Sequence, residues 1–344
     1  MTSQTVQNPT SSQADDLTLS PLAPTAEDEL LAFYREYLPR GEDVARYCAW
    51  RRQRGKADGG VEPTVARQGG RLVGAVSSIR VTLQSSGRRV AGSWQVDSVV
   101  APSMRGRGVG RRLVDAAAAP YVVAMAKGTA PGMYRLRRRA GFEEVPGANY
   151  LVAIVGNRTR GSRRRRLAFP AVHALSAFRR VGRRAGELHR VTHFDGRFDD
   201  LAEAMVDAPE WTPVKTSAYL EWRYRDCPER EYLILAAPGT REPGGAVVVR
   251  MDHTRREGYL VDALYDPRNQ ALGHLLVGGA LRVFSREGIT AVWTLATSRP
   301  ARRVLRAWGF LPTRRTPHFT FRSRDVDLRT GCNIWHGDGD AELY

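Results

Sequence analysis

The stretch APSMRGRGVGRRLV, from Ala101 to Val114, places four arginines and three glycines between two apolar segments. The preceding VDSVV predicts a strand that runs into Pro102, and the following GVGRRLVDAAAA predicts a helix that starts near Gly108. A helix N-terminus binds anions, because it offers unpaired N–H groups and a partial positive charge. Glycines let the backbone approach an anion, and arginines add charge-assisted contacts to phosphate oxygens. The stretch therefore favours a site for a diphosphate group.

Two other interpretations of this stretch stay open. A glycine-rich turn between a strand and a helix often has no ligand, and on the shape of the loop alone this interpretation is as good as a phosphate site. A disordered arginine–glycine segment that binds RNA is less consistent with the sequence, because both flanks are apolar and favour a folded core.

The residues around the stretch predict an α/β domain. A helix is expected in TAEDELLAFYREYL, with Thr25 as its N-cap, and strands are expected between Pro63 and Pro102, separated by Gly-Gly and Ser-Ser-Gly turns. After the central helix follow a short strand in YVVAMA, a helix in TAPGMYRLRRRAGF with Thr129 as its cap and Gly141 at its end, and a strand in EEVPGANYLVAIVG. This order predicts helices packed on a mixed, mostly antiparallel sheet.

The second half of the chain repeats landmarks of the first. YLEWR at 219–223 matches YCAWR at 47–51, LYDP ends at Pro267 as VVAP ends at Pro102, and AWGF matches RAGF, with offsets of 172, 165 and 168 residues. Three matches in order at nearly one offset indicate a tandem duplication. The expected organisation is a disordered lead in 1–25, a first domain in 26–156, an arginine-rich linker in 157–192, a degenerate second domain in 193–330 and a tail in 331–344.

The stretch VVAPSMRGRGVGRRL resembles the acyl-CoA signature of the GNAT superfamily of N-acetyltransferases, in which Val-x-Pro precedes Arg/Gln-x-x-Gly-x-Gly/Ala. RAGFEEV is similar to the end of a later helix of that family. The resemblance covers 26–156 with a specific motif and 193–330 only in layout. It implies two tandem GNAT-like domains, of which the second has lost its cofactor loop, because DPRNQALGHLL lacks the repeated glycines.

This resemblance implies an acyl-CoA-dependent N-acyltransferase, which moves an acyl group, acetyl in the first instance, from the CoA thioester to a primary amine by direct attack. The co-substrate would be acetyl-CoA or another acyl-CoA. The strand before the loop would splay from the strand in YVVAMA and hold the pantetheine arm through Ser98, Val99 and Val100. The CoA pyrophosphate would be bound by Arg105, Gly106, Arg107, Gly108, Val109, Gly110 and Arg111.

Many relatives have a tyrosine four residues before the Gly-Phe glycine, and it protonates the departing thiolate. Here that position is Arg137 in the first copy and Leu305 in the second. Tyr134, one helical turn earlier, is the candidate substitute, although it is also consistent with a packing role. Asp97 is the candidate base, because a free alkylamine is mostly protonated near neutrality and must lose a proton; a solvent-facing strand residue is the simpler interpretation of Asp97.

The net charge of +17 is concentrated in one segment, because Asn157 to Arg190 contains eleven arginines and one acidic residue. Within it, PAVHALSAFRRVGRR predicts a helix with separate apolar and arginine faces. A solvated connector or a helix lying on anionic lipid is favoured over a nucleic-acid site, because the segment has few aromatic residues. The alternative function is a non-catalytic scaffold that docks through 157–190 on an anionic membrane or on nucleic acid.

Three scattered cysteines, a polar N-terminus without the pattern of a secretory signal, and no long apolar run predict a cytoplasmic protein, with peripheral contact to a membrane as an option. The seven histidines have no metal-ligand spacing, so no metal is expected. The acceptor stays open: a small-molecule amine, an amine-bearing glycan precursor and a protein lysine all fit.

Overall fold

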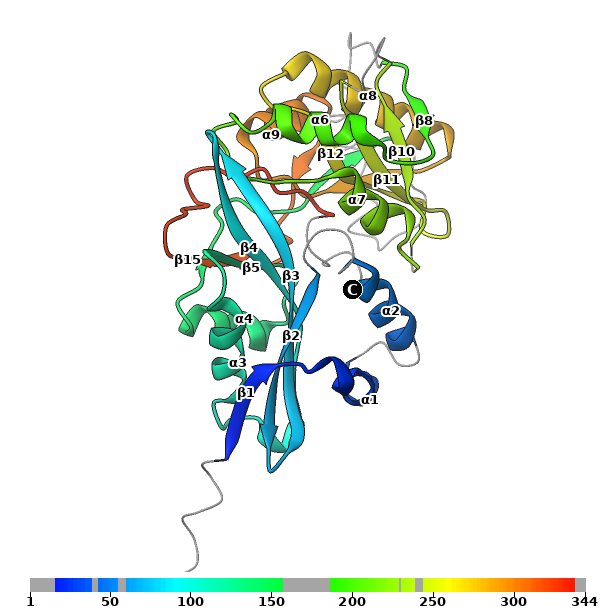
Figure 1. Ribbon diagram of the computed structural model, residues 1–344. Helices are drawn as coiled ribbons and strands as arrows, with labels where there is room; N and C mark the ends of the chain where they lie inside the picture. Colours follow the sequence, from blue (N-terminus) through cyan, green and yellow to red (C-terminus); the bar gives the residue numbers. More distant parts are fainter. Residues whose placement is uncertain are drawn as a thin grey trace, which may run out of the picture.

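The computed structural model describes residues 16–38, 43–54, 60–156, 186–228, 230–238 and 244–337. Most of the arginine-rich linker, including the predicted amphipathic helix, lies outside the described residues. Among the helices that are described, none combines the length and apolar character needed to cross a membrane. Two sheets, one below the other in Figure 1, carry the helices on their faces.

The first sheet has eight strands in the order β1-β2-β3-β4-β5-β15-β6, with β9 paired to β3. All neighbouring strands are antiparallel except β4 and β5, which confirms the predicted mixed, mostly antiparallel sheet. The strands are β1 (Leu17–Pro21), β2 (Val61–Gln68), β3 (Arg71–Ser85), β4 (Arg88–Val100), β5 (Val123–Ala126), β6 (Glu143–Glu144), β9 (Thr212–Pro213) and β15 (Thr320–Ser323).

Helices cover both faces of this sheet. The helices α1 (Glu27–Tyr37) and α2 (Val44–Arg54) pack on one face, and α3 (Val109–Ala118) and α4 (Pro131–Arg139) pack together on the other (Figure 1). The predicted caps Thr25 and Thr129 are wrong. A 3-10 turn, Pro24–Ala26, precedes α1, and Pro131 starts α4 with its fixed φ, so Ala26 and Ala130 are the N-caps.

The second sheet repeats this arrangement in the order β14-β7-β13-β12-β11-β10-β8. Among the described residues, its one parallel pair is β12 with β13, in the same relative place as β4 and β5. The strands are β7 (Leu151–Ile154), β8 (His189–Val191), β10 (Leu233–Ala236), β11 (Ala246–Asp252), β12 (Glu257–Leu264), β13 (Ala291–Thr294) and β14 (Leu311–Pro312). The helices are α6 (Gly196–Ala204), α7 (Ser217–Leu220) with a π-helical turn Glu221–Arg225, α8 (Gln270–Arg286) and α9 (Arg299–Ala307).

The two halves exchange a strand. β7 leaves the first half and lies between β13 and β14 of the second sheet, and β15 returns from the C-terminal part to lie between β5 and β6 of the first. The strand predicted at the end of the first domain is therefore present, but it completes the other sheet. The predicted disordered lead also differs, because its residues Leu17–Pro21 form β1, whose Leu17 and Leu19 pack against the apolar cluster under α3.

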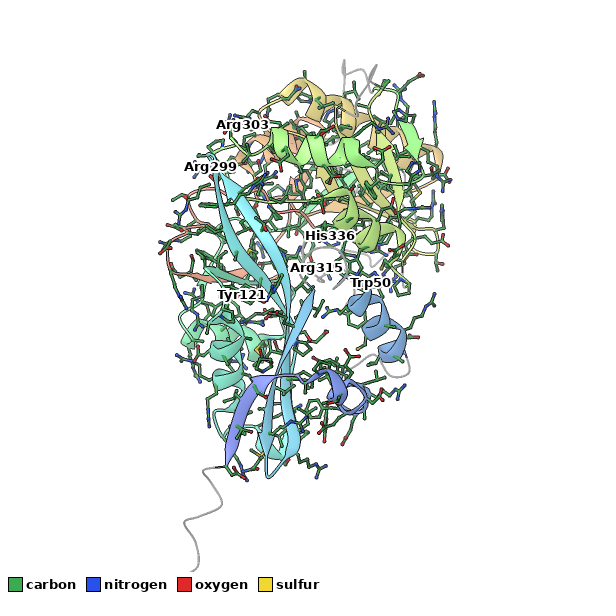
Figure 2. All side chains as sticks on the ribbon, in the orientation of Figure 1. Trp50, Tyr121, Arg299, Arg303, Arg315 and His336 are labelled. Carbon is green, nitrogen blue, oxygen red and sulfur yellow. The ribbon has the colours of Figure 1, made fainter. Side chains whose placement is uncertain are left out.

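A tryptophan pair joins the two halves. Trp50 and Trp222 stack with ring centroids 4.6 Å apart and an angle of 6° between the rings. Each indole N–H donates a hydrogen bond to the backbone carbonyl of the other tryptophan, at 2.8 and 3.0 Å. Figure 2 shows Trp50 at the end of α2 that faces the second half. This reciprocal contact has the two-fold symmetry expected of a duplication, and both tryptophans are buried as the sequence predicts.

Candidate functional site

The glycine-rich loop forms an exposed turn at the start of α3. Gly106 and Gly108 have φ values of +79° and +78°, and Gly108 is the N-cap of α3 without a side-chain cap. A Cβ added at either glycine would meet nothing within 4 Å, so both face open space. Within the described residues, no backbone carbonyl accepts a hydrogen bond of standard geometry from the N–H groups of Gly106 to Gly110. The turn is thus a row of bare N–H groups at a helix N-terminus, which suits an anion.

Two arginines of this loop form hydrogen bonds within the protein, and a third is exposed. Arg105 donates to the carbonyl of Val100 at 3.2 Å, and Arg107 is exposed. Arg111 turns toward the helices, where it bonds Asp115 at 2.6 Å and the backbone carbonyl of Arg139 at 2.7 Å. The third glycine, Gly110, leaves room for the packing of α4, because a Cβ at this position would lie 3.0 Å from Leu136.

β4 and β5 diverge next to this loop and leave a gap in strand pairing. The two strands pair only from Gly92 with Val123 to Trp94 with Met125, and then they diverge. From Gln95 to Val100, no strand of the described residues pairs with β4 on the side of β5. The predicted pantetheine residues Ser98, Val99 and Val100 lie on this free stretch, so it leads directly into the bare turn.

In the second half, the chain itself bridges the corresponding gap in strand pairing. β12 and β13 pair until Leu260 and Thr294, after which residues 335–337 bridge the gap. Trp335 forms an antiparallel bridge with Ala296, and the N–H of Gly337 donates to the carbonyl of Val261 at 2.8 Å. The N-cap of α8, the helix that follows β12, is Asn269, whose side chain accepts from the N–H of Leu272 at 3.1 Å. The second copy therefore has its gap in strand pairing bridged and its helix N-terminus capped.

Asp97 lies at a bulge in β4. The register with β3 shifts between Ala75 and Ser77, and Asp97 adopts a φ of +47°. A bulge reverses the direction in which the following side chains point. The interpretation of Asp97 as a solvent-facing residue is therefore wrong: its side chain is 1% exposed and faces α1 and α2, where Arg51 Nη1 lies 2.8 Å from its carboxylate.

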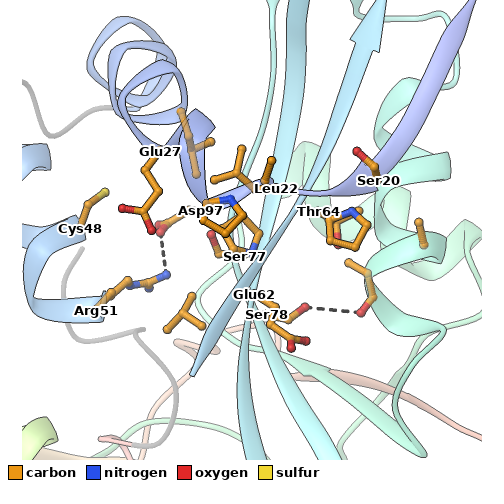
Figure 3. A pocket seen from close by; sticks show the side chains of 18 of the residues that line it. Ser20, Leu22, Glu27, Cys48, Arg51, Glu62, Thr64, Ser77, Ser78 and Asp97 are labelled. Carbon is orange, nitrogen blue, oxygen red and sulfur yellow. Dashed lines mark hydrogen bonds and ion pairs between the residues drawn. The ribbon is translucent and has the colours of Figure 1, made fainter. Parts of the chain in front are cut away.

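A cavity of about 580 Å³ begins at Asp97 (Figure 3). Tyr34 and Ser77 line it beside Asp97 and share a hydrogen bond of 2.9 Å. Burial, and then the charge of Asp97, raise the pKa of Tyr34 above its ordinary value. Leucines and prolines of β1, α1 and β2 form part of the remaining wall, and Glu27 and Glu62 add two more carboxylates. The cavity is therefore mostly apolar and has three carboxylates among its lining residues.

Tyr134 and Arg137 lie one turn apart on α4. The hydroxyl of Tyr134 donates to Glu144 at 3.1 Å, and its ring packs on His318. Arg137 is 1% exposed and reaches β4, where Nη2 donates to Ser98 Oγ at 3.1 Å. Burial lowers the pKa of Arg137 to about 9, which leaves it charged at neutral pH.

The sequence pattern did not identify every residue that the fold brings to this site. Arg51, Tyr34 and Ser77 join Asp97 from three separate elements, and only Arg51 left a signal, as the last residue of the repeated Tyr-x-x-Trp-Arg motif. Its counterpart Arg223 is also buried, and it donates to the carbonyl of Gly337 at 3.2 Å. In the part of the chain that is described, no three His, Cys, Asp or Glu side chains are grouped to hold a metal ion.

The second copy has a buried aspartate at the matching place. Asp262 stands five residues before Pro267, as Asp97 stands five before Pro102. Lys215 holds both carboxylate oxygens of Asp262 at 2.7 Å, and the hydroxyl of Tyr224 donates to it at 2.8 Å. All three side chains are buried, so this network packs the core of the second half.

Comparisons with known proteins agree with this geometry. Residues 24–128 match the sequence model of the acetyltransferase (GNAT) family. A probable N-acyltransferase from Enterococcus faecalis has a TM-score of 0.62 at 12% identity, covering 89% of this chain and 72% of its own. A GCN5-related N-acetyltransferase from Anabaena variabilis has a TM-score of 0.63 at 13% identity, with the same coverage of 89% and 72%.

A third similar structure is N-myristoyltransferase from Saccharomyces cerevisiae with bound myristoyl-CoA. Its TM-score is 0.52 at 12% identity, and the match covers 89% of this chain and 82% of that one. No curated protein matches the sequence. These identities show a shared fold, and the family match falls on the half that contains the unpaired stretch of β4 and the bare turn. Residues 24–128 are therefore a GNAT-family domain, within a chain that has the two-sheet fold of GNAT N-acetyltransferases.

Proposed function

We propose that the protein is an acyl-CoA-dependent N-acyltransferase whose first half carries the reaction. The observation that carries the proposal is the continuity of the free edge of β4 with the bare N–H groups of Gly106 to Gly110. Acyl-CoA would place its pyrophosphate on the turn and its pantetheine arm along residues 98–100. Among acyl-CoA donors, we expect the enzyme to use acetyl-CoA.

The acceptor would enter the cavity beside Asp97. An amine that approaches from this side reaches the carbonyl carbon of a thioester held along β4. Asp97 would take the proton that the nitrogen loses, while Arg51 offsets the charge of the carboxylate in the buried site. Tyr134 is the residue that the sequence offers to protonate the departing sulfur, and its hydroxyl donates to Glu144 at 3.1 Å in this structure. The apolar walls and the carboxylates favour a small amine with an apolar body. An amine-bearing glycan precursor is the second acceptor to be tested.

A thiol-release assay with acetyl-CoA and a panel of amines tests this function. Asp97→Asn should lower turnover by about 10²-fold or more, because general base catalysis typically contributes 10²–10⁴-fold. Asp325→Asn is the matched control, since Asp325 lies on the surface, 3.7 Å from Arg88. Absence of thiol release with every amine, together with absence of acetyl-CoA binding in calorimetry, would refute the proposal.

The scaffold hypothesis has less support. It depends on the segment 157–190, of which 157–185 lie outside the described residues. Binding to anionic vesicles or DNA without any thiol release would favour it. We propose a cytoplasmic enzyme, in the compartment where an acyl-CoA donor would be at hand.

A further inference from the structure

Arg137 is a buried cation, and no carboxylate of the described residues lies within 4.0 Å of it. Its polar contacts are Ser98 Oγ at 3.1 Å and the carbonyl of Gln95 at 3.5 Å. Its Nε has no hydrogen-bond partner in the described part of the chain. Burial of an unpaired charge costs several kcal/mol, and an anion that joins the charge removes much of this cost.

The guanidinium group lies on the path of the proposed donor. A strand advances about 3.3 Å per residue, so the free edge from Val100 to Gln95 is roughly 17 Å long. An extended pantetheine arm with its pyrophosphate near Gly108 has a comparable reach. The thioester sulfur would therefore come to lie near Gln95 and Ser98, the two residues that Arg137 contacts. The bond to Gln95, at 3.5 Å, is weak and easily exchanged for a ligand.

The second copy lacks this cation. Leu305 stands at the matching position of α9 and is fully buried in the apolar cluster around Phe310. Residues 335–337 bridge the gap in strand pairing beside it. The charged side chain thus occurs in the copy in which no backbone segment of the described residues bridges the gap, and an apolar one occurs in the copy in which residues 335–337 do.

We propose that the guanidinium of Arg137 binds the sulfur of acyl-CoA and stabilises the thiolate as it departs. The inference rests on the proposed function. The amine reacts in its neutral form: its nitrogen forms a bond to the carbonyl carbon, the C–S bond breaks, and the electron pair of this bond leaves with the sulfur. The proton lost by the nitrogen passes to Asp97 and then to solvent, and Arg137 neither gains nor loses a proton. A thiolate stabilised in this way departs without a proton from Tyr134.

The test measures the ionisation of the CoA thiol in the complex of CoA with the full chain. Thiolate absorbs in the ultraviolet, so a pH titration of the bound product gives the thiol pKa. A cation within reach lowers such a pKa by about 1–3 units. We expect this lowering in the wild type and its retention in Arg137→Lys, but a value near that of free CoA in Arg137→Gln. Arg135→Gln, on the exposed face of α4, is the matched control and should behave as the wild type.

Turnover provides a second readout. Arg137→Gln should lower kcat by about 10²-fold with little change in the KM for acetyl-CoA, because the charge on sulfur develops only in the transition state. A thiol pKa in the wild-type complex equal to that of free CoA overturns the inference, whether or not the variants fold. Failure of the wild type to bind CoA at all refutes the proposed function itself, so the two failures are distinguishable.

Discussion

Substitution of Gly108 by aspartate tests the anion site in detail. Gly108 is the N-cap of α3 at a φ of +78°, and an added Cβ meets nothing within 4 Å. An L-residue in this conformation costs about 1–2 kcal/mol, but aspartate tolerates it better than most residues and also caps helices. We therefore expect the free energy of unfolding to fall by no more than about 1 kcal/mol.

The effect on binding should be much larger. The new carboxylate would occupy the N–H groups meant for the pyrophosphate, and charge-assisted hydrogen bonds contribute about 1.5–3 kcal/mol each. Two charges 4 Å apart also repel each other by about 1 kcal/mol in water and about 4 kcal/mol near a protein surface. A loss of about 3–5 kcal/mol corresponds to a Kd for CoA that is roughly a hundredfold to a few thousandfold weaker.

Gly288→Asp is the control for this prediction. Gly288 follows α8 in the second half, has a φ of +71°, and also faces open space. Its carboxylate adds a small cost at a helix C-terminus, about 0.3–1 kcal/mol, so this variant should be the less stable of the two. Calorimetric titration with CoA and thermal unfolding are measured on both. If the two variants bind CoA equally well, the turn at Gly108 is not the pyrophosphate site.

Three further predictions concern the rest of the chain. Trp222→Ala removes the stack with Trp50 and should lower the free energy of unfolding by about 3–5 kcal/mol in denaturant titration; a loss below about 1 kcal/mol would show that the pair does not join the halves. Burial raises the pKa of Asp115, but hydrogen bonds from Arg322 and Arg111 outweigh it, so the pKa lies below its ordinary value. A group with a lowered pKa stabilises the folded state at pH values above its pKa in the unfolded chain, and this stabilisation is lost as the pH falls through its pKa in the folded chain. Wild type should therefore have a higher Tm than Asp115→Asn at pH 7 and lose this advantage below about pH 4. A difference in Tm that does not change with pH would contradict this. Tyr134→Phe should keep kcat within about tenfold of wild type, because the thiolate departs against Arg137, and a loss of about 10²-fold or more would instead assign the proton to Tyr134.

Features that depend on neighbouring residues could be predicted from the sequence. Gly108 starts α3 and Gly141 follows α4 at a φ of +80°, because a left-handed residue at a helix end is a local requirement that glycine meets. The residues of the hairpin turns at Gly69–Gly70 and Ser86–Gly87 also have positive φ values, as tight two-residue hairpin turns require. The divergence of β4 from β5, which the family resemblance implied, is also present.

Features that depend on distant pairing could not be predicted. The strands LVAI and TFRS are each four residues long, and nothing in them indicates which of two similar sheets they complete. The burial of Asp97 could not be predicted because it depends on distant helices that cover both faces of the sheet, and the bulge in β4 decides which of these faces the side chain meets. The role inferred for Arg137 was hidden because an arginine on an arginine-rich helix is usually exposed.

Hydrogen–deuterium exchange with and without CoA tests the central claim most directly. The first half has an unpaired stretch of β4 followed by a turn of bare N–H groups, and the second has a gap in strand pairing that residues 335–337 already bridge. We predict that CoA slows exchange in residues 98–110 and leaves residues 261–273 unchanged. Slowed exchange at 261–273, or none at 98–110 in the presence of saturating CoA, would contradict the account.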